Sequence, residues 1–110
     1  MEKYTDGNFS YEIRENHAIV TEMNTDNEIV EIPAQIKGVP VTELGDYLFS
    51  GKSCQCIRIP SGVRKIGRYG FYNCRFLEEL WFSSDFVDLG SGAFTGCHKI
   101  QRLEVQMNSR

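Results

Sequence analysis

Apolar residues recur along the chain with a period of 23 positions. Phe71 and Phe94 are separated by this interval, and so are Leu80 and Leu103. An earlier, less regular copy contains Phe49 and is one residue shorter. Because one unit of this length cannot bury its own apolar face, successive units are expected to stack as the coils of a solenoid. The repeat therefore predicts that Phe71 and Phe94 lie one above the other in neighbouring coils.

Two kinds of segment alternate within each unit. Three short segments have strand alternation, with two apolar residues inward and the one between them outward: Ile57–Ile59, Leu80–Phe82 and Leu103–Val105. Stacked coils place such strands in a parallel ladder, about 4.8 Å apart. In the segments between them, apolar residues lie three or four positions apart. This spacing predicts a tight helical turn on the side of the solenoid opposite the strands. Gly67 and Gly90 open these turns, where a side chain is expected to crowd the coil.

The amino-terminal part has a different pattern. Residues 9–13 alternate apolar and polar side chains, residues 18–23 are extended, and Glu15 and Asn16 between them are suited to a turn. This predicts a β-hairpin in which Asn16 adopts the left-handed conformation. The chain is thus expected to form one domain with a hairpin cap at 1–27, repeats at 28–107 and a tail at 108–110.

Composition narrows the class of protein. The chain has 110 residues, 41% of them hydrophobic, which suits one packed domain, and no apolar run approaches the roughly 18 residues of a membrane-spanning helix. A net charge of −3 disfavours nucleic-acid binding. Residues 1–50 contain 3 Lys/Arg and 10 Asp/Glu, whereas residues 51–110 contain 9 and 5. This asymmetry fits either head-to-tail contact between molecules or ordinary solvated loops.

The four cysteines are predicted to be free thiols. Cys54 and Cys56 do not have the doubly paired spacing of common zinc sites, and Cys54 falls on an inward position of the repeat. Cys74 and Cys97 occupy one position in adjacent coils, so their Cα atoms are expected to be about 4.8 Å apart. A disulfide between these two, or a metal site at the other pair, is the alternative. We predict no catalytic residue, no cofactor and no metal.

Outward positions of the ladder are the candidate binding residues. The repeat aligns Arg58, Trp81 and Glu104 in one row and places Glu79 and Arg102 in the row beside it. Tryptophan and arginine are enriched at the centres of protein interfaces, so these five residues are predicted to bind a protein partner. The alternative is that Arg58 stacks on the indole and merely covers it.

Several runs carry a family resemblance: 36–45, 59–67, 70–74 and 92–97. They resemble BspA-type leucine-rich repeats, about three of which fit in this chain, and residues 9–23 resemble the hairpin that often opens such proteins. The resemblance implies a β-rich leucine-rich-repeat solenoid with short helical turns on the convex side and an amino-terminal β-hairpin cap. Family members are mostly surface or secreted proteins of host-associated microbes, and several are adhesins.

The resemblance also implies a function. We expect a non-enzymatic protein-interaction module with an unidentified protein partner, as in an adhesin-like microbial surface protein. The alternative is a structural spacer or self-associating element without a dedicated ligand. An extracellular or cell-surface location follows if the resemblance holds, although Met1–Asp6 lack the basic flank and apolar stretch of an export signal.

The carboxyl end raises the question of what covers the last coil. Only polar residues and one methionine follow the final predicted strand. An exposed strand edge favours pairing with another chain. The sequence therefore predicts either a homodimer through the carboxyl-terminal coil or a last coil shielded by the tail.

Overall fold

The computed structural model describes residues 2–83 and 88–106, and within them the chain forms strands and turns but no helix. The side chains of Ser83, Glu104, Val105 and Gln106 are not described. The strands are β1 (Glu2–Thr5), β2 (Phe9–Arg14), β3 (His17–Met23), β4 (Ile29–Glu31), β5 (Gln35–Ile36), β6 (Val39–Leu44), β7 (Cys56–Arg58), β8 (Lys65–Ile66), β9 (Glu79–Ser83), β10 (Asp88–Leu89) and β11 (Arg102–Gln106). Accordingly, the described residues contain no helix that could cross a membrane.

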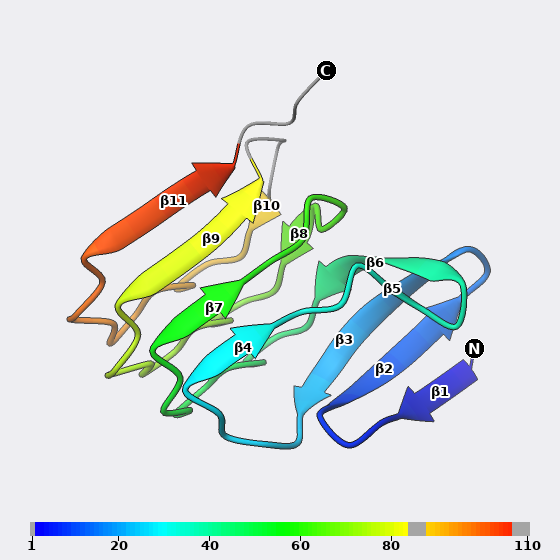
Figure 1. Cartoon of the computed structure of the whole chain (residues 1–110), viewed down its shortest axis with the longest axis horizontal. Helices are drawn as coiled ribbons and strands as arrows, with labels where there is room; N and C mark the ends of the chain where they lie inside the picture. The colour runs from blue at the N-terminus through cyan, green and yellow to red at the C-terminus, as the bar shows by residue number, and fades with distance from the viewer. Residues whose placement is uncertain (1, 84–87, 107–110) are drawn as a thin grey trace.

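The strands form two sheets that make opposite sides of a β-solenoid (Figure 1). The ladder sheet has the order β11-β9-β7-β4, and all its pairs are parallel. The cap sheet has the order β1-β2-β3-β6-β8-β10, with β5 paired to β6. Each coil contributes one strand to the ladder sheet and one to the cap sheet, and a turn then leads to the next coil. The described residues thus wind about four turns, of which β11 begins the last.

The amino-terminal cap continues a sheet of the solenoid. Strands β1, β2 and β3 form an antiparallel meander, and β3 pairs in parallel with β6 of the first coil. The predicted hairpin between β2 and β3 is present, but the expectation for Asn16 is wrong. Glu15 has the positive φ of 29° instead. The two-residue turn requires a left-handed residue, and the backbone reaches that conformation one position earlier than the asparagine.

Aromatic side chains form a column through the core. The rings of Phe49 and Phe71 are stacked at 5.3 Å, and those of Phe71 and Phe94 at 5.2 Å with 3° between their planes. Phe49 and Phe71 are fully buried. The prediction that equivalent phenylalanines lie one above the other is therefore confirmed, because each coil repeats the backbone path of the coil before it.

The predicted helical turns are wrong. In the segment after β8, alternate amides donate across to the next coil instead of along their own segment: Tyr69 to Ser91, Phe71 to Ala93 and Asn73 to Thr95, at 2.9–3.0 Å. Two of the amides between them close separate turns: Tyr72 donates to the carbonyl of Tyr69, and Cys74 donates to the carbonyl of Phe71. Tyr69 and Asn73 also have positive φ values of 52° and 55°, which interrupt a right-handed helix. The apolar spacing near three and four therefore reflects successive tight turns.

The glycine prediction is confirmed. A Cβ placed on Gly67 would lie 2.6 Å from the backbone nitrogen of Asp46 and 2.7 Å from the carbonyl carbon of Gly45. A Cβ on Gly90 would lie 2.5 Å from the backbone nitrogen of Arg68. All three distances are shorter than real Cβ contacts, so glycine is what permits successive coils to approach this closely.

Candidate protein-binding surface

The ladder sheet brings the predicted binding residues together. Its register aligns Arg58 with Trp81 and Trp81 with Glu104, and it aligns Glu79 with Arg102. The inward positions between them, Ile57 and Leu80, are buried in the core. The predicted rows therefore exist, because side chains alternate across a strand and parallel strands repeat in register. The side chain of Glu104 lies outside the described part of the chain, so only its backbone position is placed.

Trp81 is held in place by its neighbours. The guanidinium carbon of Arg58 lies 5.0 Å from the centre of the indole ring. The indole Nε1–H donates a hydrogen bond to the Oε1 atom of Glu79 at 3.3 Å. The indole is half-buried, whereas Arg58 is exposed to solvent. Contacts with both neighbours restrict the ring, so it would lose little conformational freedom on contact with a partner. Arg102 is exposed on β11, the strand beside it.

Sequence reasoning missed the two outward residues of β4. Ile29 aligns with Cys56, and Glu31 aligns with Arg58, so both rows extend across a fourth strand. Ile29 is 65% exposed. The first coil is longer than its successors because it contains the β5–β6 hairpin, whose turn at Lys37 and Gly38 has positive φ at both residues. This insertion interrupts the 23-residue period, although the inward alternation of Val30 and Ile32 was a usable signal.

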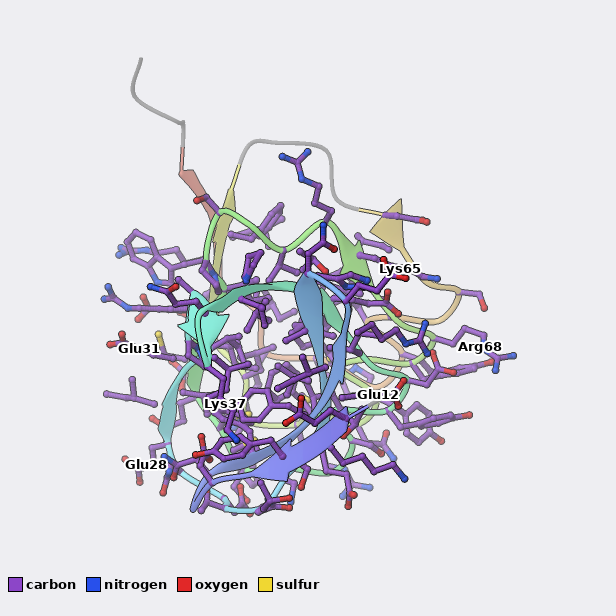
Figure 2. All side chains as sticks on the ribbon, turned by 90° about the vertical axis from the view of Figure 1, so that its right-hand side faces the viewer. Glu12, Glu28, Glu31, Lys37, Lys65 and Arg68 are labelled. Atoms are coloured by element: carbon purple, nitrogen blue, oxygen red, sulfur yellow. The ribbon has the colours of Figure 1, made fainter. Side chains whose placement is uncertain are left out.

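Charges of both signs are distributed over the ladder sheet. Glu31, Arg58, Glu79 and Arg102 alternate in sign from one strand to the next. An alternating pattern gives no strong field of one sign, so recognition here relies on matched pairs of charges rather than on long-range attraction. Figure 2 shows Glu28 and Glu31 on one side of the molecule and Lys65 and Arg68 on the other.

All four cysteines are free thiols, and two of them, Cys74 and Cys97, are hydrogen-bonded between coils. The Sγ of Cys74 donates to the carbonyl oxygen of Phe49 at 3.1 Å, and the Sγ of Cys97 donates to the carbonyl oxygen of Phe71 at 2.9 Å. Hydrogen bonding with Cys54 and burial both raise the pKa of Cys74, and burial raises the pKa of Cys97. A raised pKa keeps these two thiols protonated and weakly nucleophilic. Within residues 2–83 and 88–106, no three potential ligands converge on a metal position.

Comparisons with known proteins agree with this architecture. The family model described as "BspA type Leucine rich repeat region (6 copies)" matches residues 21–110. No curated protein matches the chain.

Solved structures of other bacterial proteins share the fold. A leucine-rich cell surface protein of Faecalibacterium prausnitzii is 26% identical, with a TM-score of 0.82 over 97% of this chain and 32% of its own. A leucine-rich repeat protein of T. pallidum is 24% identical, with a TM-score of 0.76 over 93% of this chain and 49% of its own. One from Bacteroides capillosus is 17% identical, with a TM-score of 0.73 over 94% of this chain and 98% of its own. The chain thus spans about a third and about half of the first two. Because the family match covers most of the sequence and the coils have the expected form, this chain belongs to the BspA-type leucine-rich repeat family.

Proposed function

We propose that the chain is a non-enzymatic module that binds a protein partner through the outward rows of its ladder sheet. The observation that carries this proposal is Trp81, held between Arg58 and Glu79 at the centre of that sheet. A restricted tryptophan beside an arginine is the usual composition of an interface centre. The cation–π contact leaves the charged Arg58 exposed, so it can form a further bond with a partner carboxylate. Arg102 and Glu104 extend the surface along β11.

The test compares one substitution on the ladder sheet with one away from it. A partner recovered by the wild-type chain from cell-surface extracts is measured against Trp81→Ala and against Arg64→Ala, whose side chain is exposed outside the ladder sheet. Trp81→Ala is expected to weaken binding about 30-fold, the effect of losing an interface centre worth about 2 kcal/mol. Arg64→Ala is expected to bind as the wild type does. Equal binding by both variants, with unchanged circular dichroism, would reject this surface. Failure of the wild-type chain to recover any partner would favour the structural spacer.

We further propose that the module acts at a microbial cell surface, in the manner of an adhesin. Support comes from the family resemblance and from the F. prausnitzii relative, which is described as a cell surface protein. Antibody labelling of intact and permeabilised cells tests the location. Signal from intact cells is expected, and signal that requires permeabilisation would contradict the proposal.

A second candidate function is self-association through the carboxyl-terminal coil. Its support is a wholly apolar hollow at that end, lined by Ile66, Leu80, Phe82, Leu89, Phe94 and Leu103. Leu89 is 45% exposed and Leu103 is 55% exposed. Exposed apolar side chains next to a strand edge favour contact with a second copy of the chain. We propose a homodimer that covers this hollow.

Light scattering on a concentration series tests the dimer. Leu103→Glu is expected to shift the wild-type dimer to a monomer, because the charged side chain would be buried at the interface. Ile29→Glu is the matched control, since Ile29 is also exposed but lies on β4 at the other edge of the ladder sheet. A wild-type chain that stays monomeric, or two variants that dissociate equally, would contradict dimerisation at this end.

A further inference from the structure

The wall formed by the turns carries a cluster of three tyrosines. The rings of Tyr47 and Tyr69 are stacked at 5.2 Å with 16° between their planes. Tyr72 meets both rings edge-on, at 6.3 Å and 5.7 Å. Tyr47 is 53% exposed, and none of the three hydroxyls has a hydrogen-bond partner among the described residues. This tyrosine cluster is distinct from the ladder sheet, because its residues belong to the turns that follow the strands of the cap sheet.

The backbone at two of these tyrosines is in an unusual conformation. Tyr47 and Tyr69 have φ values of 57° and 52°, and the equivalent residue of the next coil is Gly92, with φ 67°. A bulky side chain is disfavoured in this left-handed region, where glycine is the ordinary choice. A Cβ on Gly92 would overlap the Cε1 atom of Tyr69, so the ring of Tyr69 lies over that glycine. The rings are thus packed into a fixed arrangement before any partner arrives.

A cationic hollow lies beside the tyrosine cluster. It has a volume of about 270 Å³ and is lined by Gly51, Lys52, Asn73, Arg75 and Phe76. The amide of Gly51 donates to the carbonyl of Tyr72 at 2.9 Å, which places the hollow next to that tyrosine. No lining residue is acidic, and neither Lys52 nor Arg75 has an ion-pair partner within the described ranges.

The surroundings add aromatic and cationic groups. Phe76 is 49% exposed, and the Nζ atom of Lys99 lies 5.6 Å from the centre of its ring. The carboxylates lie outside the hollow. Asp46 forms an ion pair with Arg68 at 3.2 Å, Glu22 lines a separate hollow together with Tyr47 and Lys52, and Asp26 accepts a hydrogen bond from the amide of Ser53 at 2.7 Å. Within the hollow itself the charged lining groups are therefore two cations, Lys52 and Arg75.

We propose that the tyrosine cluster and the cationic hollow together form a second docking site, which binds an acidic peptide segment of a protein partner. A Glu or Asp carboxylate of the segment binds between Lys52 and Arg75, where the arginine can donate two parallel hydrogen bonds. The next residues of the segment lie along Tyr72, whose neighbours Tyr69 and Tyr47 donate through their hydroxyls. This site is independent of the ladder sheet, so it goes beyond the function proposed above.

The ring geometry favours a peptide over an acidic polysaccharide. Sugars bind aromatic residues mainly by lying flat on a ring face. Here one face of Tyr69 is covered by Tyr47 and the other lies toward Gly92, while Lys99 lies over Phe76. The tyrosines instead offer ring edges and hydroxyl donors on restricted side chains, which is typical of surfaces that bind proteins.

Fluorescence anisotropy with labelled synthetic peptides tests the proposal on the full chain. The probes are a short peptide of alternating Glu and Leu, and matched peptides in which Gln or Lys replaces Glu. The Glu peptide is expected to bind, and the double variant Lys52→Gln, Arg75→Gln is expected to bind it about tenfold or more weakly, as loss of a charge-assisted hydrogen bond predicts. Tyr72→Ala is also expected to weaken binding of the Glu peptide.

Two controls make the result specific. Arg64→Gln removes an exposed cation away from the hollow, and Trp81→Ala alters the ladder sheet; both are expected to bind the Glu peptide as the wild type does. No binding of the Glu peptide, equal binding of the Lys peptide, or an equal loss with Arg64→Gln would overturn the site. Polygalacturonate that binds through Lys52 and Arg75 when the Glu peptide does not would also overturn it, in favour of a polysaccharide. Loss with Trp81→Ala alone would place the acidic segment on the ladder sheet.

Discussion

The substitution Gly67→Ala tests how closely the coils approach, although it adds only one methyl group. A Cβ at this position would lie 2.6 Å from the nitrogen of Asp46 and 2.7 Å from the carbonyl carbon of Gly45. Ordinary contacts begin at 3.4 Å, so the two coils would have to separate by 0.7–0.8 Å, which is the difference between these distances. The amide of Gly67 donates to the carbonyl of Leu44 at 2.9 Å across the same gap, and this bond would lengthen.

The magnitude follows from three contributions. Overpacking of this kind costs about 1–3 kcal/mol. Weakening one hydrogen bond between the coils costs about 1 kcal/mol more. The lower entropy of the unfolded chain with Ala in place of Gly offsets about 0.4–1 kcal/mol. The free energy of unfolding is therefore expected to fall by about 1–3.6 kcal/mol, which corresponds to a urea midpoint lower by about 0.5–1.8 M for a typical slope of about 2 kcal/mol/M.

Urea unfolding followed by circular dichroism measures this loss against two matched glycines. Gly7→Ala is expected to leave the midpoint nearly unchanged, because a Cβ there meets nothing within 4 Å. Gly45→Ala is expected to be intermediate, because its Cβ would lie 3.1 Å from one carbonyl oxygen of Val20. If Gly67→Ala unfolded at the same midpoint as Gly7→Ala, the coils could not be packed as closely as the structure has them, and the reasoning would be refuted.

Three further predictions concern the core, the cap and the thiols. Phe71→Ala is expected to lower the free energy of unfolding by about 3–5 kcal/mol, because it removes the middle ring of the column. Phe94 is only half-buried, so Phe94→Ala should lower the free energy of unfolding less in the same urea assay. The reverse order would contradict the stacking. Burial tends to raise the pKa of Asp6, but hydrogen bonds from the amides of Phe9 and Asn8 lower it below 3.8 overall. Because the pKa of Asp6 is lower in the folded chain than in the unfolded chain, its carboxylate stabilises the fold at pH values above the unfolded-state pKa. This stabilisation is lost as the pH falls through the folded-state pKa, so the difference in Tm between wild type and Asp6→Asn should shrink from about pH 6 to about pH 3. A difference in Tm that stays constant would contradict the prediction. Maleimide is expected to label Cys56 first in the native chain and all four thiols after denaturation, as mass spectrometry would report, and fewer than four would indicate a disulfide.

Much of the fold could be predicted because a repeat encodes its own geometry. Residues one period apart must return to equivalent positions if each coil covers the one before it. That single condition was enough to stack Phe71 on Phe94, to align Arg58 with Trp81 and to require glycine at 67 and 90. The candidate surface on the ladder sheet followed from the same condition, since alternation along each strand separates inward from outward side chains.

The tertiary structure decided the features that the repeat does not encode. An apolar spacing near three and four fits both a helix and successive turns, and only the amides that donate to the next coil distinguish them. The first coil contains the inserted β5–β6 hairpin, which interrupts the 23-residue period, so the register of its strand β4 in the ladder is fixed by pairing with β7.

The grouping of side chains on the wall formed by the turns likewise depended on backbone conformation and on contacts between coils. Tyr47 and Tyr69 adopt left-handed φ values that their residue type disfavours, and no local propensity indicates it. Lys52 and Arg75 come together because neighbouring coils are hydrogen-bonded at Gly51 and Tyr72. The sequence by itself determined which residues recur and therefore stack. The packing of one coil against the next determined which non-repeating side chains share a surface, because that depends on the path of the backbone between the repeated positions.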